Sequence, residues 1–545
     1  WPKILASEDR EEALNALDKE IHSLIHTFDV LEPILEGDPD YEEAQQLACS
    51  GRYIIARRRD GKLKARAVKQ GFKEDLIAAD GPDFNYYANV AKMDTVRATY
   101  FRRRRGNRKT VIRDAKCAYL QSHKYPKDHP KKYACFKHPQ TSQWTYFRQK
   151  GPMYGENSAA VYWEETIAPW IIEQGFERGC NDQCIFYNAE HDLVVLLYVD
   201  DILMDGEQED IDWFDYKLVN RFDCKDREDL TVDNPVDYIG LEMSMDVTYI
   251  YLAMEEYTIK MLHIMDMADC RPASTPIDKP IENNTPLPKH LRRQFMTGVG
   301  MSGWLVNTIR FDCAFTQSRI SQHLANPTQG AFDALKHLMK YYKSTYNLCL
   351  RQPLHAEVSV RHLITGIAES EHHFWRFFSD TDFASNAEPQ NKRRSQNCFV
   401  AVCDEAPIKW YSKVSSVAFA HPAIGEAHAE MSSAASEVYG ASNACCDAMQ
   451  LSYIVDELRL PFPMPFTLEI DNAAALAFAK HTAFKSKLKH IDCRQEWVKT
   501  LRDHNICKPV HVPTDLNLAD LGTKINPKPI FERLRDRVMH RLPLP

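Results

Sequence analysis

The stretch Leu196–Gly206, "LLYVDDILMDG", places two adjacent carboxylates, Asp200 and Asp201, in the most apolar part of the chain. They follow an unbroken apolar and aromatic run over 193–199 that is typical of a buried strand. Burying an unpaired carboxylate costs several kcal/mol, so two of them here need a chemical purpose. Successive strand residues point to opposite faces, and only a turn lets both acids approach one metal ion. The pattern predicts two tightly joined strands with the acids at the bend.

A third acid, Asp114 in "VIRDAKCAYL", ends another apolar strand and is the candidate to complete this site. Mg²⁺ is commonly held by one or two carboxylates together with substrate phosphates. Two such ions can hold the attacking and leaving oxygens of a phosphoryl transfer. Asp114, Asp200 and Asp201 therefore predict a polymerase-like site for two Mg²⁺ ions, with Mn²⁺ as the alternative ion.

The charge of the chain is unevenly distributed. The 545 residues carry a net charge of −8, which does not suggest a nucleic-acid partner, and 44% are hydrophobic, which allows a sizeable core in two to four domains. Residues 1–50 hold 3 Lys and Arg against 13 Asp and Glu, whereas residues 51–113 hold 18 against 6. That basic block predicts a surface that binds a polyanion. A solvated face or a disordered basic tract is the alternative.

The 15 cysteines are odd in number and contain no CxxC pair, which indicates reduced thiols in an intracellular protein. The longest apolar run is far too short for a bilayer, and no secretory signal is visible, so no membrane partner is expected. Because the first residue is Trp, we expect a fragment or a product cut from a longer precursor.

Periodicity divides the chain into four parts. Residues 1–50 read as an acidic helical segment. Residues 51–270 alternate hairpins with two amphipathic helices, and 271–367 begin with a Pro-rich linker followed by helices. Residues 368–545 read as strands, a long helix from about Ala427, and further strands and helices. The prediction is an α+β chain.

The motifs resemble the copia class of long-terminal-repeat retrotransposon Pol polyproteins, from about Glu11 to about Lys524. The motifs that carry the resemblance are "DGKLKARAVKQGF", "IRDAKCAYLQ", "MYGENSAAVYWEE", "YVDD" and "YIGLEM", in that order. The resemblance implies a right-hand polymerase with fingers, palm and thumb over 51–270, a connection over 271–367 and a ribonuclease H-like domain over 368–545. It implies that Asp114, Asp200 and Asp201 are the catalytic acids of a reverse transcriptase.

Four further acids resemble the ribonuclease H site. Asp380 ends the strand "RFFSD", Asp471 ends "TLEID", Glu437 lies on a helix and Asp520 lies in "LNLADLGTK". The resemblance implies that they bind two Mg²⁺ ions and cut the RNA strand of an RNA–DNA hybrid. Two pairs of alternatives stay open, Asp382 for Asp380 and Glu430 for Glu437. His490 and Asp492 in "KHIDCRQEW" are interpreted mainly as structural.

The resemblance also assigns residues that bind substrate. Lys64 and Arg66 fall where fingers cations hold the incoming triphosphate, and an exposed hairpin face is the alternative. Tyr119 falls where an aromatic ring excludes a 2′-hydroxyl, and a buried core tyrosine is the alternative. Ser158 replaces a glutamine that touches the nucleotide, and Tyr198 precedes the paired acids.

Some positions depart from the family pattern. Four arginines, Arg102–Arg105, fall where an apolar helix is usual, Ala160 and Val161 replace a Pro-Arg pair, and "IRFD" over 309–312 replaces an Arg-Pro-Asp motif. These departures favour an alternative, a decayed or co-opted copy that binds nucleic acid without catalysis.

The resemblance implies the partners of the chain as well. They are an RNA template, a DNA primer, the RNA–DNA hybrid and deoxynucleoside triphosphates, with the integrase and capsid parts of the same element. The expected location is a cytoplasmic virus-like particle, with the nucleus as a further destination.

Overall fold

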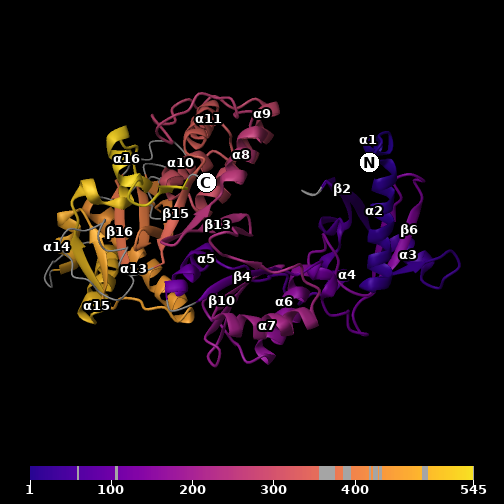
Figure 1. Cartoon of the computed structure of the whole chain (residues 1–545). Helices are drawn as coiled ribbons and strands as arrows, with labels where there is room; N and C mark the ends of the chain where they lie inside the picture. Colours follow the sequence, from indigo (N-terminus) through magenta and orange to yellow (C-terminus); the bar gives the residue numbers. More distant parts are fainter. Residues whose placement is uncertain are drawn as a thin grey trace.

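The computed structural model describes residues 1–57, 61–104, 108–354, 375–383, 394–415, 419–420, 427–428, 433–480 and 489–543. The strands form four main sheets, some of which combine strands that are far apart in the sequence, and helices cover them (Figure 1). The architecture confirms the predicted α+β class, with a right-hand arrangement followed by a mixed α/β domain. Among the described residues, none of the helices is long and apolar enough to cross a membrane.

The first sheet forms the fingers, and its strand order is β1-β6-β5-β2-β3. The predicted hairpin is confirmed as its edge, because β2 and β3 pair antiparallel with Ile54 opposite Arg66 and Ala56 opposite Lys64. The bounds of the strands are β1 Leu31–Ile34, β2 Cys49–Arg57, β3 Leu63–Lys69, β5 Lys132–Lys137 and β6 Trp144–Gln149. The short helices around them are α1 Pro2–Leu5, α3 Tyr41–Leu47 and α4 Leu76–Asp80.

The acidic N-terminal helix α2 (Arg10–His22) lies on the fingers sheet. Leu17 is fully buried in one cluster with Ala65 and Ala67 of β3. Glu20 accepts a hydrogen bond from the backbone N–H of Ala67 at 3.0 Å. The helix therefore supports the strand that carries Lys64 and Arg66.

The second sheet is the palm, with strand order β11-β4-β10-β9-β8-β7. Helices α6 (Ala159–Glu173) and α7 (Gln208–Arg221) cover one face through Trp163, Ile167, Phe214 and Leu218. The short helix α5 (Met93–Thr99) packs on the other face. The strand bounds are β4 Lys109–Asp114, β7 Glu177–Arg178, β8 Ile185–Asn188, β9 Leu193–Tyr198, β10 Asp201–Gly206 and β11 Glu228–Asp229.

The third sheet joins distant parts of the chain. The hairpin predicted over 237–252 is confirmed as β13 and β14, and β15, from beyond the Pro-rich linker, pairs with β14. The near-C-terminal β23 pairs with β15. The strand bounds are β12 Val236–Tyr238, β13 Leu241–Met245, β14 Tyr249–Ala253, β15 Leu348–Pro353 and β23 His540–Arg541. The helices beside it are α8 Glu255–Ile264, α9 Lys289–Thr308, α10 Ala314–Ser321 and α11 Gln329–Ser344.

The fourth sheet is mixed, with order β18-β17-β16-β21-β22. Its first three strands are antiparallel, while β21 pairs parallel with β16 and β22 parallel with β21. The long helix begins at Ser433 and not near Ala427, because residues 427–428 pair with 419–420 as a small ribbon. The bounds are β16 Trp375–Asp382, β17 Gln396–Cys403, β18 Ala406–Val414, β19 Phe419–Ala420, β20 Ala427–His428, α13 Ser433–Glu457, β21 Phe466–Ile470, α14 Ala473–Lys480, α15 Lys489–Asp503, β22 Cys507–His511 and α16 Lys528–Arg535.

A buried arginine ties the palm to the fourth sheet. Arg97 of α5 donates to the carbonyl oxygens of Ile408 at 2.6 Å and Asn307 at 2.7 Å, and its guanidinium lies 3.9 Å from the ring centroid of Trp410. Glu457 at the end of α13 accepts hydrogen bonds from the palm N–H groups of Cys180 at 2.7 Å and of the next residue at 2.6 Å. These contacts hold the C-terminal domain directly against the palm.

Candidate functional site

The paired acids lie at the bend between β9 and β10, as the apolar pattern predicts. Asp201 stands opposite Asp114 on one side and opposite Tyr198 on the other. The turn requires a left-handed conformation at Val199, with φ of 56°. The Trp163 indole fixes that conformation by donating to the carbonyl oxygen of Val199 at 2.6 Å. The N–H of Ala115 donates to the carbonyl oxygen of Asp200 at 2.7 Å, which ties the turn to β4.

The three carboxylates repel one another because they are crowded and partly shielded from water. Burial, then the charges of Asp200 and Asp114, raise the pKa of Asp201 to about 7. Burial, with help from Asp114, also raises the pKa of Asp200. Lys225 donates to Asp114 and offsets some of the negative charge. A cation that replaced these protons would relieve the repulsion, and so the donor set fits Mg²⁺.

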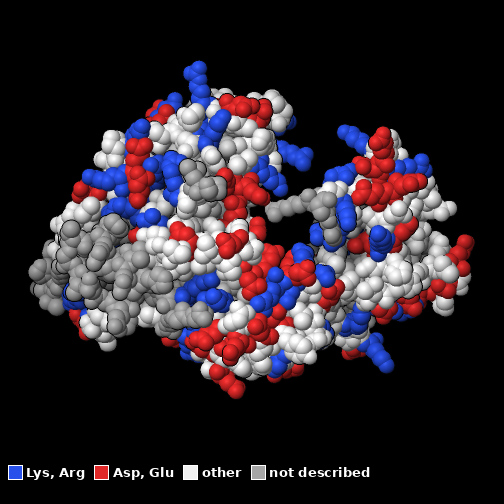
Figure 2. Space-filling view, viewed as in Figure 1, with Lys and Arg blue, Asp and Glu red and all other residues white. Residues whose placement is uncertain are grey.

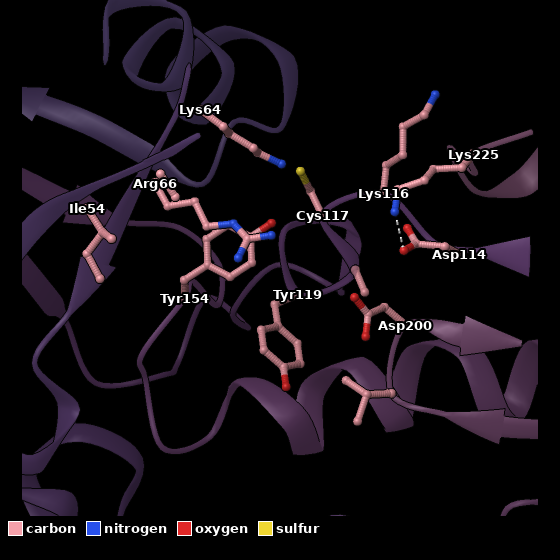
Figure 3. Close-up of a pocket in the computed structure, with 13 residues that line it drawn as sticks. Ile54, Lys64, Arg66, Asp114, Lys116, Cys117, Tyr119, Tyr154, Asp200 and Lys225 are labelled. Carbon is pink, nitrogen blue, oxygen red and sulfur yellow. Dashed lines mark hydrogen bonds and ion pairs between the residues drawn. The ribbon is translucent and has the colours of Figure 1, made fainter. Parts of the chain in front are cut away.

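A pocket of about 870 Å³ joins Asp114 and Asp200 to the fingers, and Asp201 is not among the residues that line it. Figure 3 shows Lys64 and Arg66 projecting from β3 on one side of the pocket and Asp114 and Asp200 on the other. Alternate residues of a strand share a face, so Lys64 and Arg66 point together. The arrangement offers cations where phosphates would enter and carboxylates where metal ions would sit.

Two tyrosines form the floor of this pocket between the cations and the acids. The ring centroids of Tyr119 and Tyr154 lie 6.2 Å apart, and the Arg66 guanidinium lies 5.6 Å from the centroid of Tyr154. Burial and the nearby charge of Asp200 raise the pKa of Tyr119, so its hydroxyl stays protonated. Tyr119 therefore lines the pocket beside the acids, and its predicted part in sugar selection stays a prediction.

Ser158 does not line this pocket, which corrects the expectation that it touches a nucleotide. It is fully buried at the start of α6, and its hydroxyl lies 3.3 Å from the Lys132 ammonium and 3.4 Å from Glu156. Tyr198 also lies outside the pocket lining, half-buried opposite Asp201 and packed against the core.

Among the lining residues that sequence reasoning missed, four have side chains able to form polar contacts, namely Tyr154, Lys116, Cys117 and Lys225. Tyr154 lies in the quoted "MYGENS" motif, four residues before Ser158. The motif therefore indicated the correct loop but not the side chain of that loop that lines the pocket. Lys116 and Cys117 come two and three residues after Asp114, and Cys117 has a left-handed φ of 54° that turns the chain. Lys225 is brought to the site by an isolated β-bridge between Ala115 and Cys224, and no local sequence pattern indicates that bridge.

The second group of acids meets in the C-terminal domain. Ligand oxygens of Asp380, Glu437 and Asp471 all lie within 4.8 Å of one another. Asp380 and Glu437 are 4% exposed, and the Glu437 Oε2 atom accepts no hydrogen bond from the part of the chain that the structure describes. A buried carboxylate oxygen without a donor is costly, so the cluster fits a metal ion that would take it as a ligand.

The electrostatics of this group are more extreme than those of the palm. Burial, then Asp380 and Asp471, raise the pKa of Glu437 to about 10. Burial and Asp380 raise the pKa of Asp520 to about 8, although Lys524 lies beside it. Of the open alternatives, Asp380 rather than Asp382 joins the group, and Glu430 lies outside the described residues. The side chains of His490 and Asp492 also lie outside the described part of the chain.

With this geometry established, the chain can be compared with known proteins. Residues 49–279 match the family described as "Reverse transcriptase (RNA-dependent DNA polymerase)". The chain is 22% identical to the "Retrovirus-related Pol polyprotein from transposon TNT 1-94" of Nicotiana tabacum, over 99% of this chain and 38% of that protein. It is 24% identical to the Pol polyprotein from transposon RE2 of Arabidopsis thaliana, over 72% of this chain and 25% of that protein.

These similarities confirm the resemblance to copia-type Pol polyproteins, and the chain spans less than two fifths of either relative. A solved structure, the foamy viral protease-reverse transcriptase in complex with double-stranded DNA, matches 92% of this chain and 70% of that chain at 12% identity and a TM-score of 0.45.

Proposed function

We propose that this chain, whose residues 49–279 match the reverse transcriptase family, is an RNA-directed DNA polymerase that also cuts the RNA strand of RNA–DNA hybrids. The observation that carries the proposal is the single pocket that joins Asp114 and Asp200 to Lys64 and Arg66. Its substrates would be deoxynucleoside triphosphates, an RNA template and a DNA primer.

The residues of the pocket divide the work of nucleotide addition. Arg66 and Lys64 would hold the triphosphate, and Arg66 is steadied by the ring of Tyr154. Asp114, Asp200 and Asp201 would hold two Mg²⁺ ions, which neutralise charge on the attacking and leaving oxygens when bound. Tyr119 would lie under the sugar. Catalysis would come from positioning and charge stabilisation rather than from covalent chemistry.

A hollow above the palm offers room for a primer–template duplex. Figure 2 shows this face of the molecule hollowed between the fingers and the helices α8 and α9, with the palm below. The β12–β13 turn lies in the third sheet within the motif "YIGLEM", which resembles the primer grip of the family, and carries left-handed residues Ile239 and Gly240. We infer that the primer end rests between this turn and the paired acids.

The test is primer extension on an RNA template with Mg²⁺. Asp201→Asn should abolish extension and leave cleavage of a preformed hybrid intact, because the second group of acids is separate. The matched control is Asp233→Asn, an exposed acid of the palm, which should extend normally. Normal extension by Asp201→Asn would remove that residue from the site.

The converse variant tests the second activity. Asp471→Asn should eliminate RNA-strand cleavage and spare extension, with the exposed Asp503→Asn as its control. Loss of both activities in a folded Asp471→Asn protein would contradict the two-site assignment. A wild-type chain that binds hybrid without extension or cleavage would support the alternative of a co-opted binding protein.

The setting of the reaction is also a proposal. The Pol relatives support an element-encoded enzyme that works with integrase and capsid parts in a cytoplasmic virus-like particle, with the nucleus as a further destination. Co-sedimentation of the chain with element RNA in particles would test this setting.

A further inference from the structure

The structure separates the four acids of the C-terminal domain into a group of three and one acid that is paired with a lysine. Asp380, Glu437 and Asp471 form the compact group, and Asp520 lies beside Asp380 without being a member of that group among the described residues. Asp520 instead lies 2.9 Å from the ammonium of Lys524, four residues later. The fourth acid of the predicted metal site, Asp520, therefore already forms an ion pair with a lysine.

The segment that carries this pair is firmly anchored. Gly522 lies so close to β17 that a Cβ there would be 2.3 Å from the Cys398 sulfur, and its carbonyl oxygen accepts from Ser412 at 2.6 Å. The Thr523 hydroxyl donates to Asp380, one of the three grouped acids. The Asn526 side chain donates to the carbonyl oxygen of Asp520 at 2.8 Å. These contacts fix the backbone on both sides of Lys524.

The side chain of Lys524 itself is less confined. It is 36% exposed, whereas the Asp520 side chain that it contacts is 4% exposed. Its ammonium also interacts favourably with Asp380 and Asp471 across the mouth of the group. A long flexible side chain on a fixed backbone can leave the acids without unfolding the segment.

We propose that Lys524 is a resident cation of this site, which occupies the Asp520 side and competes there with a divalent ion. The proposal rests on the proposed function, because it concerns the metal ions of the hybrid-cutting site. The group of Asp380, Glu437 and Asp471 binds one divalent ion readily, and a second ion enters beside Asp520 only when the ammonium moves away. Lys524 is thus a positioning residue that sets the metal affinity of the site.

The experiment measures metal binding directly, without RNA cleavage. Mn²⁺ is titrated calorimetrically into the metal-free full chain carrying Asp200→Asn and Asp201→Asn, so that binding at the palm is suppressed. In that background, Lys524→Met should bind Mn²⁺ about tenfold more tightly, because a competing positive charge is gone. Lys524→Arg should keep the weaker binding, and Lys528→Met, which removes an exposed lysine of α16, should change nothing.

A second measurement separates this role from a structural salt bridge. In a chelator, Lys524→Met should melt at a lower temperature than its parent, and Mn²⁺ should restore more stability to it than to the parent. Unchanged or weaker Mn²⁺ binding by Lys524→Met would overturn the proposal, even if the protein were destabilised. If Lys524→Met does not fold in chelator, the double variant Lys524→Met with Asp520→Asn removes both members of the pair. Its Mn²⁺ affinity is compared with that of Asp520→Asn alone. Binding by the double variant that is no tighter would also overturn the proposal. Because no step requires catalysis, a chain that binds Mn²⁺ as expected but leaves hybrids uncut would contradict the proposed function alone.

Discussion

Replacing Arg102 by methionine should destabilise the palm more than any surface change. The Arg102 side chain is fully buried and lies 3.1 Å from Asp205 Oδ1, which is also fully buried in β10. It donates to the carbonyl oxygen of Leu458 beyond α13 and to that of Asp192 at 3.0 Å. Removing one partner of a buried ion pair costs about 3–5 kcal/mol. Each kcal/mol shifts the melting temperature of a domain of this size by about 2–4 °C, so we expect a loss of at least roughly 6 °C.

The assay is thermal unfolding of the full chain followed by tryptophan fluorescence. Arg52→Met, an exposed arginine of β2, is the control and should change stability by less than about 0.5 kcal/mol. Adding Asp205→Leu to Arg102→Met should recover much of the loss, since both buried charges are then gone. A loss under about 1 kcal/mol for Arg102→Met alone would refute the reasoning, because the ion pair would then not be needed to balance Asp205.

Two further predictions concern the palm site. Tyr119→Val should let ribonucleotides be incorporated, because Tyr119 lies in the pocket lining beside Asp200. An unchanged ratio of deoxyribonucleotide to ribonucleotide incorporation would make Tyr119 a core residue only. In chelator, stability should fall as the pH rises from about 4 to about 7, because the folded chain raises the pKa of Asp201 from 3.8 to about 7 and so binds its proton more tightly than the unfolded chain. Asp201→Asn should flatten that decline in melts at pH 5 and pH 8, and an equally steep decline would contradict the assignment.

The sequence predicts the palm hairpin well because its signal is local. Seven apolar or aromatic residues before Asp200 and the apolar residues after Asp201 can be satisfied only by two buried strands and a turn. The left-handed Val199 and the indole that holds it could not be predicted, since the partner comes from α6. The periodicity of apolar residues indicates which side chains are buried, whereas contacts with residues distant in the sequence determine the conformation of the turn.

The motif around Ser158 shows where position in a motif fails as a guide. Lys132 and Glu156 place a buried charge pair under the loop, with their side-chain atoms 2.5 Å apart. The Ser158 hydroxyl joins that pair rather than the pocket. A family motif transfers backbone shape more safely than it transfers the role of a substituted side chain.

The arginine run shows the opposite error. Four consecutive arginines suggest poor packing, yet Arg102 is buried against Asp205 and the end of α13. Asp205 lies in the palm and was not assigned to a catalytic motif. Only the folded structure therefore reveals that the charges of Arg102 and Asp205, each in an otherwise apolar setting, compensate each other. A departure from the family pattern is therefore weak evidence of decay until its partner is known.

The two acid groups solve the same electrostatic problem in the same way. Each gathers carboxylates whose pKa values are raised by burial and then by mutual repulsion. Each also has one lysine against its outer acid, Lys225 at Asp114 and Lys524 at Asp520. Both lysines reach the acids from exposed positions, with side chains 61% and 36% exposed. A partly exposed ammonium balances charge while the site lacks metal, and it leaves at less cost than a buried one would. The more enclosed of the two, Lys524, should therefore hinder metal entry more strongly. We accordingly expect the proposed hybrid-cutting site to need a higher Mg²⁺ concentration than the proposed polymerase site in the same preparation.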